Sequence, residues 1–312
     1  MAGGTDLTVN SNYAGQVAGE IIGKAFKESD TIKRNLVNVI PNIDFQISIR
    51  KIEFTNGLKN YACGFEPTGA VTLSEKLLTP KKLDLPLEIC KEQLRQTWSS
   101  ASMGFSAHND VMPRDIETAL IAQVLGDVSE VTESDIWTGL NTNGHFLGFI
   151  PLFEDDNDVI KANYGIVPLG ADIDKDNVVS ELEKVLNAIP VAVRKSPNLI
   201  IGVSDNVALA YTQALVSAGI NNGLGSNDYQ LKYGRYTLEI IGGLPDNTFV
   251  AYERKNLNFG TGLLSDHNML AIKDMDTVDL SGTVRYRMIY TAGVQYANSN
   301  EIVWYLSTTA VD

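Results

Sequence analysis

IDFQISIRKIEFTNG, residues 43–57, is the stretch that decides how this chain folds. Apolar residues alternate with polar ones along its first half, at Ile43, Phe45, Ile47 and Ile49. This period of two is typical of a strand with one apolar face, and Asn56-Gly57 favours a tight hairpin turn after it. At about 3.3 Å per residue the strand from Ile43 to Phe54 would span roughly 40 Å, whereas a compact chain of this length has a radius of gyration of about 20 Å. We therefore expect a ribbon that projects from its own subunit and needs a partner for its apolar face.

The pattern beyond the turn extends this ribbon to residue 90. The predicted return passes through Leu58, Tyr61, Cys63 and Phe65, and a second alternation follows at Leu83, Leu85, Leu87 and Ile89. Residues 43–90 are thus predicted to form one extended loop. Its apolar side chains, with one from the preceding segment, are the predicted subunit-interface residues: Ile43, Phe45, Ile47, Ile49, Phe54, Tyr61, Phe65, Leu83, Leu85 and Phe26.

The segments on either side of the extended loop also have features that favour subunit contacts. Residues 1–42 are rich in small and polar residues with one weak helical stripe, which predicts an arm that packs only against another molecule. Apolar residues at helical spacing predict a long helix over 113–136, with Pro113 suited to the first turn. Such a helix would be a rod of about 36 Å.

The remaining sequence predicts a mixed domain. A helix is expected over 176–189, a buried strand over 199–203 and a helix over 205–217 that Ser204 caps and Gly219 closes. Strands follow, ending in a long strand over 283–297 and a return over 301–306. The order of elements indicates an α+β fold and not a regular βαβ alternation.

Composition limits the possible functions. The chain has 312 residues, 44% hydrophobic and 20% charged, and no apolar run near the roughly 20 residues that cross a bilayer. We therefore expect a cytoplasmic product without a membrane partner. A net charge of −13 disfavours tight binding to nucleic acid, which depends on Lys and Arg. Cys63 and Cys90 lack the spacing of a zinc site or a disulfide scaffold and are predicted to be buried thiols.

One stretch resembles a calcium loop. In DIDKDNVVSELE, residues 172–183, the acids Asp172, Asp174, Asp176 and Glu183 occupy ligand positions of an EF-hand loop. The preceding Gly165, Pro168 and Gly170 cannot sustain the helix that such a loop needs. We favour helix capping by Asp174 or Asp176 and predict no metal site.

Signs of catalysis are equally weak. Gly202-Val203-Ser204 lies between a strand and a helix, as in a hydrolase, but the second Gly of the nucleophile motif is absent. The three His residues have no recognised motif around them, and the acidic run 154–158 is typical of a solvated loop. The sequence predicts no catalytic residue, no cofactor and no enzyme.

This order of parts resembles the major capsid proteins of tailed bacteriophages, whose fold is shared with encapsulins. The resemblance rests on arm, extended loop, long helix and mixed domain, and on two local phrases. GGLPDNTFVAYERKNLNFGTGLLSD, residues 242–266, is similar to a strand that crosses to an N-L-x-F-G-T turn in those proteins. TVRYRMIYTAGVQYANSNEIVWY, residues 283–305, is similar to their closing hairpin.

The resemblance implies an arm (1–42), an E-loop (43–90), a peripheral domain (91–149 and 269–312, with the spine helix 113–136) and an axial domain (150–268). It further implies hexamers and pentamers that form an icosahedral virion shell in the bacterial cytoplasm, with a portal, a separate scaffolding protein and loosely held double-stranded DNA. Some relatives cross-link the E-loop through a Lys. Lys76, Lys81 and Lys82 are candidates by position, but nothing specifies a catalytic carboxylate, and no cross-link is expected.

Two alternatives remain open at the level of sequence. An encapsulin would enclose cargo enzymes on the same fold. A monomeric α+β protein would use Asp172, Asp174, Asp176 and Glu183 for calcium or would work as a hydrolase.

Overall fold

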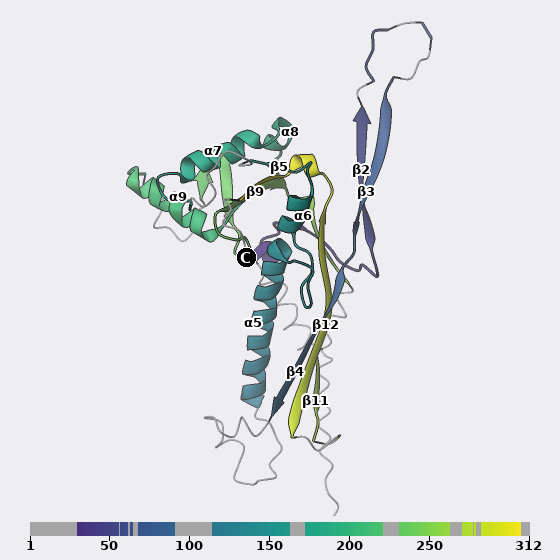
Figure 1. Cartoon of the computed structure of the whole chain (residues 1–312), viewed down its shortest axis with the longest axis vertical. Coiled ribbons are helices and arrows are strands. Elements are labelled where there is room, and N and C mark those ends of the chain that lie inside the picture. The colour runs from purple at the N-terminus through teal and green to yellow at the C-terminus, as the bar shows by residue number, and fades with distance from the viewer. Residues whose placement is uncertain are drawn as a thin grey trace, which may run out of the picture.

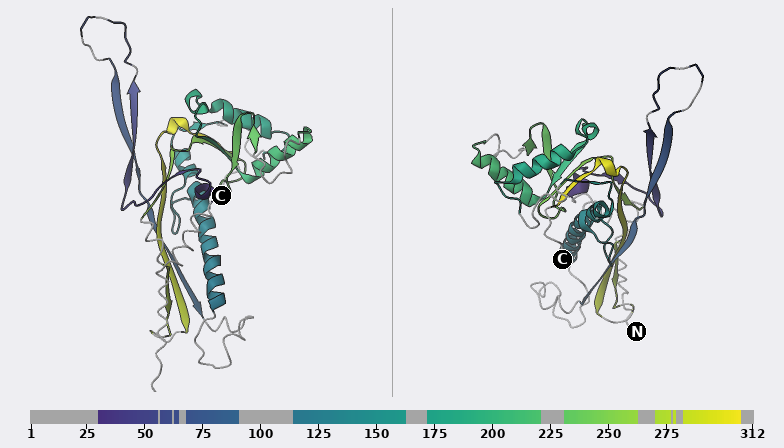
Figure 2. Two further views of the ribbon diagram at one scale, coloured as in Figure 1. Left: turned by 180° about the vertical axis from the view of Figure 1, so that it is seen from behind. Right: turned by 45° about the horizontal axis from the view of Figure 1, so that its top comes forward.

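The computed structural model is an elongated subunit with a ribbon that extends beyond the body (Figure 1). It describes residues 30–55, 57–61, 63–64, 68–90, 114–162, 172–220, 231–262, 270–276, 278 and 282–306. A long helix and long strands run down one part of the body. A second part, made of shorter helices and strands, lies to the side of them (Figures 1 and 2).

The long part of the body is built on one strand, β12 (Thr283–Tyr296). β4 (Lys81–Cys90) pairs antiparallel with β12 along one edge, from Thr283 to Ala292. β11 (Leu270–Asp274) and β10 (Leu257–Thr261) pair antiparallel with successive parts of its other edge. Side chains along β12 alternate between buried and exposed over its first half, because that half has one face on the core and one in solvent.

Helix α5 (Arg114–Thr138) confirms the predicted long helix and runs alongside these strands (Figure 1). Its last turns carry the buried contacts: Ile136 and Trp137 are fully buried, and the Trp137 ring lies 5.5 Å from Phe149 at the start of α6 (Phe149–Asp155). Val131, which the sequence pattern places on the apolar stripe, is 40% exposed. Val128, three residues earlier, is buried at 8%, so the two positions differ in burial.

The second part of the body is a six-stranded sheet with helices packed on it. Its strands in spatial order are β5 (Ile160–Lys161), β13 (Val303–Leu306), β9 (Thr248–Glu253), β6 (Leu199–Val203), β8 (Tyr236–Ile240) and β7 (Lys232–Tyr233). Its helices are α7 (Val178–Ala188), α8 (Val191–Arg194) and α9 (Asp205–Ser217). The predicted helices and the strand at 199–203 are confirmed.

The ends of α9 obey local rules. Gly219 takes φ +73°, and Ile220 N–H donates to Leu215 O at 3.0 Å, as in a Schellman motif. Ser204 precedes the helix, but its hydroxyl donates to Asn206 Oδ1 at 2.7 Å and makes no side-chain cap bond. The predicted C-terminal cap is therefore confirmed, whereas the predicted hydroxyl cap is wrong.

The predicted closing hairpin is also wrong. After the 3-10 turn η2 (Ser299–Glu301), β13 leaves the sheet of β12 and enters the six-stranded sheet between β5 and β9. Ile302, Val303, Trp304 and Tyr305 are all buried. A strand that is apolar on both faces is stable inside a covered sheet and not at the edge of a half-exposed one. In the phrase 256–261, Leu257–Thr261 likewise form strand β10 and not a turn, and only Asn256 belongs to the turn before it.

Residues 30–42 are part of the subunit body, which corrects the prediction that the whole of 1–42 packs only against another molecule. β1 (Asn38–Ile40) pairs parallel with β10, and Leu36 and Val37 are 2% exposed. At helix α2 (Asp30–Lys33), the Glu133 carboxylate of α5 accepts the Thr31 N–H at 3.2 Å and the Thr31 hydroxyl at 2.5 Å. Trp137 Nε1 donates to the same hydroxyl at 2.8 Å. This buried polar cluster fixes the segment to the long helix.

Glu133→Ala should lower the free energy of unfolding of the unassembled subunit by about 1–3 kcal/mol, because it leaves the buried Thr31 donors without an acceptor. Urea denaturation followed by Trp fluorescence measures the change. Glu130→Ala, at an exposed position of the same helix, is the control and should change stability by less than about 0.5 kcal/mol. Equal losses of unfolding free energy in the two variants would show that the buried cluster around Glu133 does not fix residues 30–42 to the long helix.

Candidate assembly surface

The projecting ribbon consists of β2 (Ile47–Thr55) and β3 (Ala70–Leu78), a separate two-stranded antiparallel sheet (Figure 1). The register runs from Ile47 opposite Leu78 to Thr55 opposite Ala70. The predicted projecting ribbon is present, but the predicted turn at Asn56-Gly57 and the return through 58–65 are wrong. The two strands are joined by residues 56–69, and the returning strand begins at Ala70.

The composition of the connection explains the difference. Gly64 has φ +120°, and Pro67 has no N–H to give to a ladder, so residues 58–67 are poor strand formers. The base of the connection is closed instead by the Thr68 hydroxyl, which donates to Gly57 O at 2.5 Å. Cys63 in this connection is exposed and Cys90 half-buried, so the prediction of buried thiols fails.

One face of the ribbon is apolar and open to solvent. Because residues directly opposite each other share a face, Ile52 lies beside Leu73 and Phe54 beside Val71 on the same side. Their exposed fractions are 71% and 63% for the first pair, and 68% and 68% for the second. We call these four residues the distal apolar face. A contiguous exposed group of large apolar side chains of this kind is typical of an interaction site.

The sequence contains a signal for this face that the interpretation of residues 43–54 as one alternating strand missed. Apolar residues occupy odd positions up to Ile49, then even positions from Ile52, so the pattern changes phase at Lys51. Since successive side chains of a strand point to opposite faces, the phase change moves the apolar residues from one face to the other. Ile49 is half-buried, and Ile52 is exposed.

The root of the ribbon, at Ile43 and Leu78, packs against the five-stranded sheet. Leu78 is 1% exposed and Ile43 is 6% exposed, and both contact the backbone of Gly260. A Cβ at Gly260 would lie within 2.6 Å of both side chains, and one at Gly293 would lie 3.0 Å from Pro80 Cα. Gly260 and Gly293 are directly paired between β10 and β12. The paired glycines therefore leave the space in which the ribbon root packs.

A polar latch, consisting of Lys76, Asp156, Tyr296 and Ser299, holds the ribbon just above its root. Lys76 Nζ of β3 lies 2.9 Å from Asp156 Oδ2 and 3.7 Å from the centre of the Tyr296 ring. The same carboxylate oxygen accepts the hydroxyls of Tyr296 and Ser299, each at 2.7 Å. The prediction that the acidic run 154–158 is a solvated loop is therefore wrong at Asp156.

The electrostatics of the latch favour the charged carboxylate. Burial alone would raise the pKa of Asp156, but the hydrogen bonds from Ser299, Tyr296 and Lys76 outweigh burial and hold this pKa well below its ordinary value. Burial and the Asp156 charge both raise the pKa of Tyr296. Because the pKa of Asp156 is lowered in the folded state, its contribution to stability is present above about pH 4 and is lost as the pH falls further.

Some of the predicted interface residues are exposed in the structure, and others are buried in the body. Phe45 is 72% exposed, Phe54 68%, Tyr61 93% and Ile47 36%. Leu83 is buried at 4%, Leu85 packs against the core, and Ile43 is buried at the root, which corrects their assignment as interface residues. The pairing of β4 with β12 explains the burial of Leu83 and Leu85, because it places them in the body. Phe26 and Phe65 lie outside the described residues.

Two of the three cross-link candidates, Lys76 and Lys81, have internal partners, whereas Lys82 is exposed. Lys76 belongs to the latch, and Lys81 Nζ donates to the carbonyl oxygens of Thr142 at 2.7 Å and His145 at 2.9 Å. His145 Nδ1 lies 2.8 Å from Asp135 Oδ1. Lys81 thus holds the loop after α5 onto the start of β4.

In the calcium-like loop, residues 172–183, carboxylate oxygens accept hydrogen bonds from groups of the same chain. Asp174 Oδ1 accepts the N–H groups of Asp176 and Asn177, and Asp172 Oδ1 accepts Asn247 Nδ2. Glu183 Oε1 accepts the Tyr233 hydroxyl. The predicted capping of α7 by Asp174 or Asp176 is wrong, because Asn177 is at the cap position and no side chain makes a cap bond. The carboxylate of Asp174 shapes the turn before the helix instead. Across the described residues, no group of three or more His, Cys, Asp or Glu side chains is placed to hold a metal ion.

No helix of the described chain is long and apolar enough to cross a membrane.

Known proteins resemble this chain in fold and not in sequence. The sequence matches no family model and no curated protein. The capsid of a native GTA particle superposes with a TM-score of 0.58 at 13% identity, over 90% of this chain and 89% of that one. The capsid of Myoviridae phage XM1 gives 0.54 at 13% identity, over 89% and 91%. A virus-like particle from Pyrococcus furiosus gives 0.52 at 8% identity, over 93% and 98%. The chain therefore has the α+β fold of phage capsid subunits, as the resemblance in sequence predicts.

Asp156→Asn should loosen the ribbon without unfolding the body, because it removes the charge that Lys76, Tyr296 and Ser299 share. We expect amide hydrogen exchange in 47–55 and 70–78 of the unassembled subunit to become at least about tenfold faster, while exchange in β12 stays unchanged. Asp158→Asn, an exposed neighbour, is the control. Unchanged exchange in the ribbon of Asp156→Asn would show that the latch does not hold it.

Proposed function

We propose that this chain is the major capsid protein of a tailed bacteriophage. It assembles as hexamers and pentamers into an icosahedral shell that encloses double-stranded DNA, and it has no enzymatic activity. The observation that carries the proposal is the distal apolar face on a projecting ribbon, in a chain with a capsid fold. A fold alone does not fix a function, so the argument depends on what that face requires.

The distal apolar face is exposed in the single chain, because a two-stranded sheet has no second layer to cover it. A sister subunit can provide this cover in a shell, where every copy places its ribbon on a neighbour. Each ribbon that buries a few hundred Å² of apolar area at about 25 cal/mol per Å² supplies several kcal/mol before ordering costs. Many modest contacts of this size are sufficient to hold a closed shell.

The domain boundaries of the proposal follow the predicted division in outline, with changes at 30–42, 81–90, 257–261 and 303–306. We assign the E-loop to β2, β3 and their connection, the peripheral domain to α5 and the sheet of β12, and the axial domain to the six-stranded sheet and its helices. Residues 81–90 join the peripheral domain, since β4 pairs with β12 over its whole length.

The net charge of −13 supports the proposed relation to the genome. A shell that is filled with DNA must not bind it tightly, and repulsion from phosphate keeps the DNA loosely held. The proposal includes a portal and a separate scaffolding protein as partners, assembly in the host cytoplasm and a final place in the virion capsid.

An encapsulin-type cargo compartment is the second candidate, favoured by the likeness to the virus-like particle from Pyrococcus furiosus. The likeness to the GTA and XM1 capsids supports the phage assignment. Copurification separates the candidates. A cargo enzyme held inside the shell would support the compartment, and a scaffolding or portal protein would support the phage.

Ile52→Ser combined with Leu73→Ser should leave a folded subunit that assembles poorly. Together the two changes remove roughly 3 kcal/mol or more of burial per ribbon contact, which weakens association about a hundredfold. Sedimentation velocity and negative-stain microscopy measure assembly. Glu53→Gln with Thr72→Ser changes a cross-strand pair on the opposite face of the ribbon and should assemble normally. Normal shells from the Ile52→Ser, Leu73→Ser variant would contradict the role of the distal apolar face.

A further inference from the structure

The six-stranded sheet with α7, α8 and α9 carries opposite charges at its two ends. Strand β6 runs parallel to β8 and antiparallel to β9, so Leu199, Tyr236 and Glu253 mark one end of the three strands. Val203, Ile240 and Phe249 mark the other end. At about 3.3 Å per residue, the five residues of β6 separate the ends by roughly 17 Å.

Cations gather where β6 and β8 begin and β9 ends. We call this the positive edge, and its cations are Arg194, Lys195, Arg235, Arg254 and Lys255. Arg254 N–H donates to Asn198 O, and Arg235 Nη2 donates to Arg194 O, so these segments lie together. Glu253 is the acid closest to them in sequence. Within the described part of the chain, none of the five cations forms an ion pair, which is unusual in a protein with a net charge of −13.

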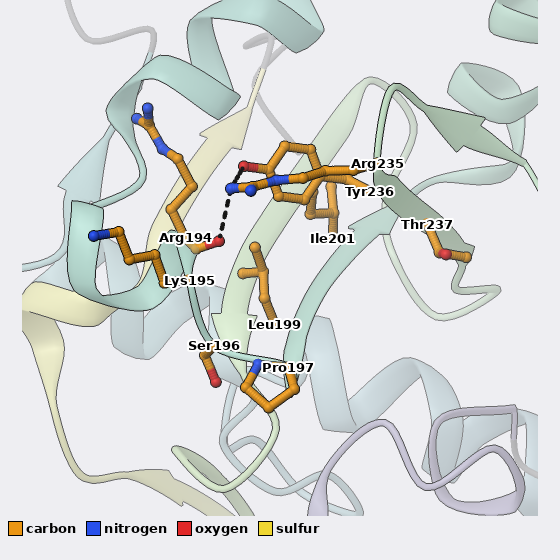
Figure 3. Close-up of a pocket in the computed structure, with 9 residues that line it drawn as sticks. All are labelled: Arg194, Lys195, Ser196, Pro197, Leu199, Ile201, Arg235, Tyr236 and Thr237. Atoms are coloured by element: carbon orange, nitrogen blue, oxygen red, sulfur yellow. Dashed lines mark hydrogen bonds between the residues drawn. The ribbon is translucent and has the colours of Figure 1, made fainter.

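The positive edge contains a pocket of about 310 Å³, lined by residues that include Lys195, Ser196, Leu199, Arg235 and Tyr236 (Figure 3). The Arg235 guanidinium stacks on the Tyr236 ring at 4.8 Å, and its Nη2 donates to the Tyr236 hydroxyl at 2.7 Å. These contacts fix the side chain and leave its Nε and Nη1 hydrogens for another acceptor. A carboxylate is the acceptor that a fixed guanidinium binds best.

The Arg194 side chain has a different role. Its guanidinium points away from Arg235 (Figure 3) and donates to Ile189 O at 2.9 Å and Asn187 O at 3.1 Å, at the C-terminal end of α7. Arg235 is therefore the cation with hydrogens left at the pocket, and the exposed Lys195 side chain points away from it (Figure 3).

Acids gather at the opposite end of the same strands. We call this the negative edge, and its acids are Asp172, Asp174, Asp176, Asp205 and Asp246, all exposed. Asn247 Nδ2 donates to Asp172 Oδ1, and Asn247 Oδ1 accepts the Ile173 N–H, which places the loop before α7 beside the start of β9. Asp205 begins α9, just after Ser204 at the end of β6. Lys175 is the one cation in this loop, and it pairs with Asp176 at 2.8 Å.

We infer that the positive edge of one copy binds the negative edge of the next copy, head to tail, and that the Arg235 pocket receives a carboxylate of that neighbour. The inference deepens the proposed function and rests on it, since the occupant is a second copy of this chain. The charges are complementary, and the two edges are too far apart for one copy to satisfy both on itself. A contact between two different edges is heterologous, so it closes into a ring when the rotation between copies allows. Complementary charges of this kind fix the direction and register of the copies in the ring.

Charge reversal tests the inference. The positive-edge variant carries Lys195→Glu and Arg235→Glu, and the negative-edge variant carries Asp176→Lys and Asp246→Lys. Each should remain folded by circular dichroism but form rings and shells at least about tenfold less readily by sedimentation velocity. A variant with all four changes keeps the net charge of −13 and should recover assembly. A mixture of the two single-edge variants should form rings with an even number of copies, such as hexamers, because each variant provides the edge that the other lacks and the two must alternate around the ring.

Several outcomes would overturn the inference. Normal assembly of both single-edge variants, or a folded four-change variant and a mixture that both stay defective, would do so. If a variant does not fold, the salt dependence of the unchanged chain decides. Association should weaken at least about tenfold between roughly 0.05 and 0.5 M NaCl, where the Debye length falls from about 14 to 4 Å, and no change would reject the contact.

The same charge-reversal variants also test a competing role for the positive edge, which is binding of nucleic acid. Loss of binding to a short DNA duplex in the positive-edge variant, with assembly unchanged, would assign the edge to nucleic acid instead. If the unchanged chain stays a single copy, the proposed function fails as well. If it forms shells and the single-edge variants form them equally, only this inference fails.

Discussion

The ribbon of β2 and β3 is a two-stranded sheet that cannot cover its own apolar face, and the rest of the structure depends on this constraint. A free hairpin of this size is marginally stable in water. Here its root is held on two sides. Leu78 and Ile43 fill the space over the paired Gly260 and Gly293, and the Lys76 latch fixes β3 to the end of α6. The distal apolar face is thus presented at a fixed place, ready for a neighbour.

The long strand β12 connects this root to every other part of the subunit. β3 leads through Thr79-Pro80 into β4, which pairs with β12 over ten positions from Thr283 to Ala292. Further along, β12 pairs with β10, whose Gly260 receives the ribbon root. The chain then crosses through η2 into β13 and the six-stranded sheet. The ribbon is therefore connected to the six-stranded sheet through strand pairing with β12 and then through the short turn η2.

The sequence predicts the elements of the fold better than it predicts their partners. The long helix, the strand at 199–203 and the helix after it follow from periodicity and caps, which are local. The return of the ribbon does not, because Asn56-Gly57 is a strong local turn signal, whereas the register of β2 on β3 is set by the packing of Leu78 at the root. The choice of sheet that β13 joins also depends on burial of both its faces, which no local pattern around Asn298 reveals.

The candidate surface shows the same division. The phase change at Lys51 is visible in the sequence and places Ile52 and Phe54 on a new face, although a single-strand interpretation misses it. The latch is different, because Lys76, Asp156 and Tyr296 lie far apart in the sequence and meet only in the folded subunit. The two charged edges likewise appear only when the strands are aligned, since their residues come from separate loops.

Electron cryo-microscopy of the purified chain under assembly conditions tests the central claim most directly. We expect closed shells in which density from a neighbouring copy covers the distal apolar face, Ile52, Phe54, Val71 and Leu73. Particles of a single copy at high concentration, or shells in which these four side chains face bulk solvent, would contradict it.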